Sequence, residues 1–83
     1  MSELTSVAIK IMNVFKYFRV KKDGYLSTKS LLSKAHLWRD VDEETFERAI
    51  DELLERGYIR ESMERMPGFF LTEIGDDYLK NQK

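Results

Sequence analysis

The side chains that most often carry out chemistry are sparse in this sequence. Histidine occurs once, as His36, and cysteine is absent. A histidine-centred catalytic triad would depend on that one residue, and no disulfide or thiolate metal site can form. The acidic residues follow helical rows without the spacing of a metal-ligand set, and no glycine-rich phosphate loop occurs. The sequence therefore predicts a protein that is not an enzyme and uses no metal or cofactor.

The charged residues are divided unevenly along the chain. Residues 1–39 carry eight Lys and Arg against two acids, a net charge of +6, whereas residues 40–83 carry six against thirteen acids, a net charge of −7. This asymmetry suggests a basic contact surface or self-association, although ordinary surface chemistry explains it equally well. No signal peptide and no apolar run long enough to span a bilayer is evident, so we expect a cytoplasmic protein without membrane contact.

The first predicted element is a helix over residues 3–20. Its apolar side chains recur at helical spacing and form one stripe, Leu4, Val7, Ala8, Ile11, Phe15 and Phe18. Further apolar residues on the flanks of the stripe offer surface to a second copy of the chain, namely Met12, Val14 and Tyr17. Gly24 follows in a turn, where it can take a positive φ.

A short extended piece and a second helix come next. Residues 25–26 are expected to pair with a later strand. Ser27 or Thr28 can cap a helix over residues 29–36, whose buried positions are expected to be Leu31, Leu32 and Ala35. In the turn that follows, Trp38 is expected to pack as a lid over the core.

The third predicted helix has the clearest signals in the chain. Asp42 suits the N-cap position, and the acids that follow suit the positive end of the helix dipole. The apolar stripe consists of Phe46, Ala49, Ile50, Leu53 and Leu54. Gly57 comes directly after the last helical residues, as a residue that lets the helix end and the chain reverse.

Two strands and a short helix complete the pattern. Strands are predicted over residues 58–62 and 69–72, and residues 66–68, Met-Pro-Gly, suit a type II turn between them. Thr72 can cap a last helix over residues 73–80, which is expected to be anchored by Ile74, Tyr78 and Leu79. The order of helices and strands predicts an α+β fold.

Part of the sequence resembles the winged helix-turn-helix superfamily. The segment AIDELLERGYIRES, residues 49–62, is similar to the end of a recognition helix that runs through a glycine into the first wing strand. The segment FFLTEIGDDYL, residues 69–79, is similar to the second wing strand and the Leu-Thr-x-x-Gly-x-x-x-Leu run of MarR-, PadR- and ArsR-type regulators and small phage or plasmid proteins. A looser likeness connects the chain with the YjcQ-like group. Gly75 in this run lets the last helix pack close to its neighbours.

The resemblance implies one winged-helix domain over residues 1–83, with a three-helix core, a wing of two to three strands and a short C-terminal helix. It also implies binding to double-stranded DNA, with the third helix in the major groove. On that hypothesis the chain is a small transcriptional regulator that forms a homodimer. Arg39 and Arg48 approach the groove, Lys29 and Lys34 contact phosphates, and Arg65 touches the backbone from the wing tip.

The charge of the third helix favours a different partner. Opposite its apolar stripe the helix carries one base, Arg48, among five acids, Glu44, Glu47, Asp51, Glu52 and Glu55. Basic residues gain affinity for phosphates by releasing counterions, whereas acidic residues lose it. The alternative is therefore an adaptor that binds a basic protein partner through this acidic face. Such an adaptor would also offer an apolar wing edge from Met63, Met66 and one of Phe69 or Phe70.

Overall fold

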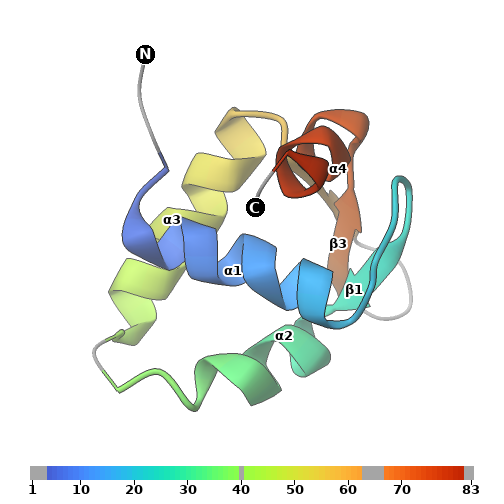
Figure 1. Ribbon diagram of the computed structural model, residues 1–83. Coiled ribbons are helices and arrows are strands. Elements are labelled where there is room, and N and C mark those ends of the chain that lie inside the picture. Colours follow the sequence, from blue (N-terminus) through green and yellow to red (C-terminus); the bar gives the residue numbers. More distant parts are fainter. Residues whose placement is uncertain (1–3, 40, 63–66, 82–83) are drawn as a thin grey trace.

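The computed structural model describes residues 4–39, 41–62 and 67–81 of the chain. These residues form four helices and a three-stranded antiparallel sheet, in the order α1 (Ser6–Tyr17), β1 (Tyr25–Ser27), α2 (Thr28–Ala35), α3 (Glu43–Glu55), β2 (Ile59–Ser62), β3 (Gly68–Leu71) and α4 (Glu73–Lys80). The α+β class and the order of elements predicted from the sequence are confirmed. Figure 1 shows α1 crossing the middle of the molecule, with α3 on one side of it and the sheet at its far end.

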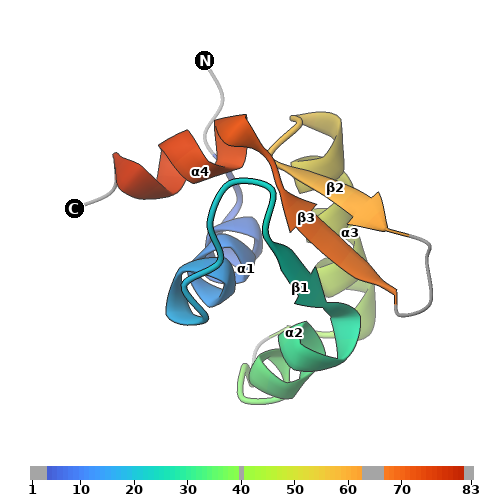
Figure 2. The ribbon, with the colours of Figure 1, turned by 90° about the vertical axis from the view of Figure 1, so that its right-hand side faces the viewer.

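The sheet has the strand order β1-β3-β2, so β3 lies in the middle although it comes last in sequence. The predicted pairing of residues 25–26 with a later strand is confirmed, since Tyr25 lies opposite Phe70 and Leu26 opposite Phe69. Alternation places the buried Leu26 and Phe69 on the face that covers the helices. Figure 2 views the sheet from its other face, with α3 behind β2 and β3.

Each helix begins at a side chain that caps its first turn. The N-cap residues are Thr5, Ser27, Asp42 and Thr72, and each side-chain oxygen accepts a hydrogen bond from the backbone N–H three residues later. The predicted caps at Asp42 and Thr72 are confirmed, and Ser27 rather than Thr28 caps α2. Hydrogen bonds from Thr45, from its side chain first and its backbone second, lower the pKa of the Asp42 carboxyl.

The core forms where α1 packs against α3 and the sheet. Its largest fully buried side chains come from every layer of the fold, Phe15, Ile11, Met12, Leu31, Leu53 and Leu71. Trp38 is half-buried and packs against this cluster beside Phe46, with 6.4 Å between the ring centroids. The expected role of Trp38 as a lid is therefore confirmed.

Two residues assigned to the core by their spacing lie at the surface. Phe18 is 41% exposed because α1 ends at Tyr17, so the helical stripe does not extend to it. Leu32 is 40% exposed because the buried side of α2 is centred on Leu31. Met12 and Val14 were expected to be exposed on the flanks of α1, but both are buried. They are buried because other helices cover α1 on more than one side. The apolar surface expected for a second copy therefore shrinks to Tyr17.

The predictions for the turns at Gly24 and Gly68 are wrong. Neither glycine has a positive φ, and each is needed because a side chain at its position would collide with neighbouring atoms. The positive φ angles before β1 belong to Arg19 and Asp23, whereas Gly24 is needed because a Cβ there would lie 2.8 Å from the Lys21 carbonyl oxygen. Gly68 is part of β3 and has no positive φ, whereas the expected type II turn requires one at this position. A Cβ on Gly68 would lie 2.6 Å from the ring of Tyr25.

The two remaining glycines behave as the sequence predicts. Gly57 has a φ of +78° directly after α3, which allows the chain to reverse into β2. Gly75 allows α4 to approach the sheet, because a Cβ there would collide with the carbonyl oxygen of Tyr58. Leu79 anchors α4 in the core, but Ile74 is 54% exposed, because it lies on the outer side of this short helix, and does not anchor it. No helix of the described residues is long and apolar enough to cross a membrane.

Candidate functional site

The outward face of α3 is acidic. Glu44, Glu47, Asp51 and Glu55 are all exposed there. The base among them, Arg48, forms an ion pair with Glu44 at 2.8 Å, and both side chains are more than 70% exposed. An ion pair this exposed adds little to stability. It does place the carboxylate of Glu44 beside Arg48, so the positive charge of Arg48 is compensated. The face therefore presents a net negative charge to any partner.

Glu52 does not belong to this open face, although the sequence placed it there. Its carboxylate accepts hydrogen bonds from the backbone N–H of Thr5 at 3.2 Å and from the Thr5 hydroxyl at 2.8 Å. It also lies 3.5 Å from the guanidinium of Arg56, and both side chains of this pair are mostly shielded. Glu52 thus joins α3 to the beginning of α1, which removes it from the surface available to a partner.

The basic residues predicted to contact DNA do not gather on one face. Lys29 and Lys34 are five positions apart on α2, which turns them roughly 140° away from each other around the helix axis. Lys34 faces α1, where its Nζ lies 3.9 Å from the centroid of the Tyr17 ring. Lys29 lies on the other side of the helix, beside Pro67, which directly precedes β3 at the loop end of the β2–β3 hairpin. Only Lys29 of this pair points toward the hairpin.

The two remaining candidates for DNA contacts are arginines. Arg39 is exposed in the turn between α2 and α3, at the end of α2 opposite to Lys29. Arg65 lies outside the described residues, as do Met63 and Met66 of the expected apolar wing edge. Phe69 is buried and Phe70 is half-buried, so within the described residues Phe70 is the one that reaches the outer face of the sheet.

A hollow of about 600 Å³ lies between α2 and Pro67 at the loop end of the hairpin, and a second of about 380 Å³ lies between α2 and the start of α3. Leu32 and His36 line both, so the two hollows are adjacent. Lys29 is the cation of the first hollow, whereas Asp42 and Glu43 border the second. This surface is mixed in charge, with an apolar floor.

His36 has a serine and an aspartate nearby, but they do not form a catalytic triad. The Ser33 hydroxyl donates to the Ser30 carbonyl oxygen at 2.7 Å. The Asp42 carboxylate accepts from the backbone N–H of Thr45 at 2.8 Å. Both groups are thus committed to the backbone of their own helices, whereas a triad requires them to bond to the imidazole. Among the residues that the structure describes, no group of three or more His, Asp or Glu could hold a metal ion.

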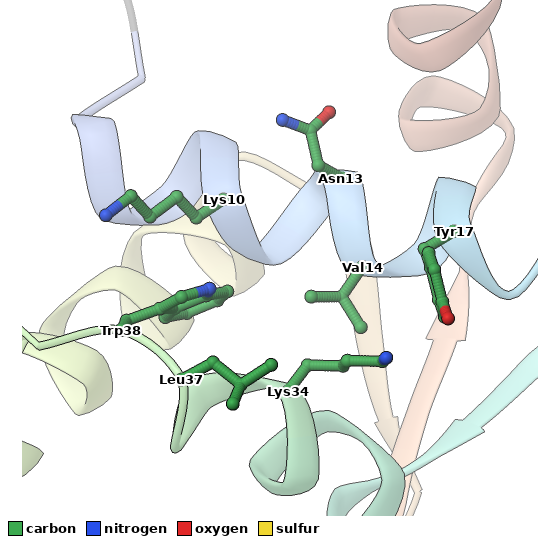
Figure 3. Close-up of a pocket in the computed structure, with 7 residues that line it drawn as sticks. All are labelled: Lys10, Asn13, Val14, Tyr17, Lys34, Leu37 and Trp38. Atoms are coloured by element: carbon green, nitrogen blue, oxygen red, sulfur yellow. The ribbon is translucent and has the colours of Figure 1, made fainter.

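A groove that sequence reasoning missed lies between α1 and α2. It measures about 310 Å³ and is lined by Lys10, Asn13, Val14, Tyr17, Lys34, Leu37 and Trp38. Figure 3 shows Trp38 at one end, Tyr17 at the other, and Val14 and Leu37 between them. The signal in the sequence was the helical spacing of Lys10, Val14 and Tyr17 on α1, but this side of α1 is less apolar than the stripe that faces the core.

No protein family, no curated protein sequence and no solved structure matches the chain.

Proposed function

We propose that this chain is a small winged-helix adaptor, without enzymatic activity, that binds a basic protein partner through the outer face of α3. The winged-helix interpretation is supported by the order of elements and by the sheet order β1-β3-β2, in which the strand before α2 pairs with the last strand of the hairpin. This arrangement leaves one side of α3 in the core and the other side facing solvent. The outer face of α3 is the surface that such a fold offers to a partner.

The observation that carries the proposal is the charge of that outer face. Four exposed carboxylates stand against Arg48, whose charge is countered by Glu44. A face of this kind attracts Lys and Arg side chains and repels phosphates. Lys34, which could have offset the acids, faces α1 instead.

A second candidate function, binding of double-stranded DNA by a transcriptional regulator, is favoured by a different observation. The beginning of α2 lies against the loop end of the hairpin, where the Thr28 N–H donates to the Pro67 carbonyl oxygen at 2.9 Å. The exposed Lys29 follows directly, so a helix N-terminus, a lysine and the hairpin meet on one side. These are groups that contact DNA phosphates. In this hypothesis Arg39 and Arg48 would contact the bases in the major groove of the DNA.

Fluorescence anisotropy with two labelled probes separates the two functions. One probe is a helical peptide of Lys and Ala, and the other is a random-sequence DNA duplex, each titrated at about 50 and 200 mM salt. The adaptor hypothesis expects binding of the peptide and no binding of the duplex. The triple substitution Glu47→Lys, Asp51→Lys and Glu55→Lys should weaken peptide binding at least tenfold, because each exposed contact contributes on the order of twofold to fivefold.

The matched control changes the net charge equally at other exposed positions. It combines Glu61→Lys on β2 with Glu73→Lys and Asp77→Lys on α4, which leaves α3 unchanged. If both triple variants lose peptide binding to the same extent, the attraction is a property of overall charge and the assignment to α3 is wrong. Binding of the duplex that disappears in a variant with Arg39→Ala and Arg48→Ala would instead establish the DNA-binding function.

A further inference from the structure

The groove between α1 and α2 has no part in the proposed function. Within the described chain its lining comes from α1, α2 and the turn after α2, and no residue of α3 contributes. Two of its residues are large apolar side chains that are exposed to solvent: Tyr17 is 65% exposed and Leu37 is 72% exposed. Exposed side chains of this kind gathered around a hollow indicate a binding surface.

The charges of the groove are all of one sign. Lys10 and Lys34 line it, and among the described residues no carboxylate does. Each ammonium group lies over an aromatic ring: the Nζ of Lys34 is 3.9 Å from the Tyr17 centroid and that of Lys10 is 5.7 Å from the Trp38 centroid. An ammonium group has three donors and a ring covers only one side of it, so each can still bind a carboxylate.

The two cations stand at opposite ends of the groove. Figure 3 shows Lys10 with Trp38 at one end and the Nζ of Lys34 beside Tyr17 at the other. Lys10 and Tyr17 are seven residues apart on α1, which corresponds to about 10 Å along the helix axis. Two turns of a second helix have the same length, so acids at positions i and i+7 of that helix would match both ends.

From this geometry we infer that the groove binds an acidic amphipathic helix of a partner protein. Glutamates at i and i+7 pair with Lys10 and Lys34. Leucines at i+3 and i+4 lie between them, against Val14 and Leu37, and are enclosed by the two rings. This surface is separate from the acidic face of α3, so the inference does not depend on the proposed function.

Trp38 makes the test specific to this site, because it is the only tryptophan of the chain. The probe is a synthetic helical peptide without tryptophan that carries Glu at i and i+7 and Leu at i+3 and i+4. The expected result is a saturable change in Trp38 emission as the peptide is added. A peptide with Gln in place of both Glu residues should bind several-fold more weakly, and equal binding of the two peptides would overturn the inference.

Variants then assign the binding to the two lysines. Lys10→Gln and Lys34→Gln should each weaken binding of the acidic peptide by up to about fivefold, the usual range for an exposed ion pair, and together by up to about 25-fold. The matched control is Lys16→Gln, an exposed position on α1 that lines a different pocket and should leave binding unchanged.

Two results would contradict the inference at this stage. One is a double variant that binds as tightly as the Lys16→Gln protein. The other is Trp38 emission that changes with protein concentration in the absence of peptide, together with a doubled mass in light scattering, because a second copy of the chain would then occupy the groove.

Discussion

The side chain of Thr72 connects three parts of the fold, and its removal is the sharpest test of the packing described above. Its single hydroxyl hydrogen faces the carbonyl oxygens of both Gly57 and Tyr58, which share it, and its oxygen accepts from the N–H of Gly75 at 3.1 Å. It therefore ties the end of α3 to the beginning of α4. Thr72→Val keeps the shape of the side chain and removes all of these hydrogen bonds, whereas Thr72→Ser keeps the hydroxyl and removes one methyl group.

The expected cost of Thr72→Val follows from these contacts. Loss of an N-cap costs about 1 kcal/mol. The Tyr58 carbonyl keeps a bond from the backbone N–H of Thr72 at 3.2 Å, but the Gly57 carbonyl loses the hydroxyl, which adds about 1 kcal/mol. We therefore expect the free energy of unfolding to fall by about 2 kcal/mol in Thr72→Val, and by well under 1 kcal/mol in Thr72→Ser.

Chemical and thermal unfolding followed by circular dichroism measure this difference. For a domain of this size, 2 kcal/mol corresponds to a Tm lowered by roughly 10 °C and a urea midpoint lowered by about 2 M. The order of the two variants is the decisive result. If Thr72→Val unfolds within about 0.5 kcal/mol of the Thr72→Ser protein, the hydroxyl does not join the two helices and this part of the reasoning is refuted.

Three further predictions test other parts of the structure. Leu53→Ala should lower the free energy of unfolding by roughly 2.5–5 kcal/mol because Leu53 is fully buried, and Leu32→Ala by less than 1 kcal/mol; equal losses in urea denaturation would contradict the assigned burial. Gly57→Ala should cost about 1–2 kcal/mol, because a Cβ there would make only an ordinary contact with Ile74 at 3.7 Å and the positive φ alone is unfavourable; an unchanged Tm would show that this strain is absent. The pKa of Asp42 is lowered below its ordinary value of about 3.8, so its stabilising contribution is present above that pH and is lost as the pH falls through the lowered pKa. The Tm of the Asp42→Asn variant should therefore fall less than that of the unchanged protein between neutral and strongly acidic solution. An equal fall of Tm in the two proteins would exclude this role of Asp42.

Local signals in the sequence were sufficient to predict the elements. Side-chain caps such as Asp42 and Thr72 act within one turn of their own helix, so their effect can be read from neighbouring residues. Gly57 is similar, since a positive φ after a helix is a local requirement. Burial is not local. Met12 is buried and Leu32 is exposed because of what other elements cover, which helical spacing alone does not determine.

The candidate sites show the same limit more strongly. The acidic face of α3 was predictable, because its members share one helix and one period. Glu52 has that period too, but a partner 47 positions away, Thr5, removes it from the face. The groove between α1 and α2 needed the relative placement of two helices and a turn. Of its two lysines, Lys34 was predicted to contact DNA phosphates, and the aromatic rings beside Lys10 and Lys34 come from other elements, which the sequence alone does not place.

The position of β3 in the sheet has a consequence for the order of events during folding. The β2–β3 hairpin and the helices form from residues close together in the chain, whereas the pairing of Tyr25 with Phe70 closes a loop that contains α2, α3 and β2. Closing so long a loop costs chain entropy, which must be overcome before the contacts between its ends can stabilise anything. Strand β1 is therefore expected to join the sheet last. It is only three residues long, so the backbone amides of β1 should exchange with solvent sooner than those of β2 and β3 in the native protein.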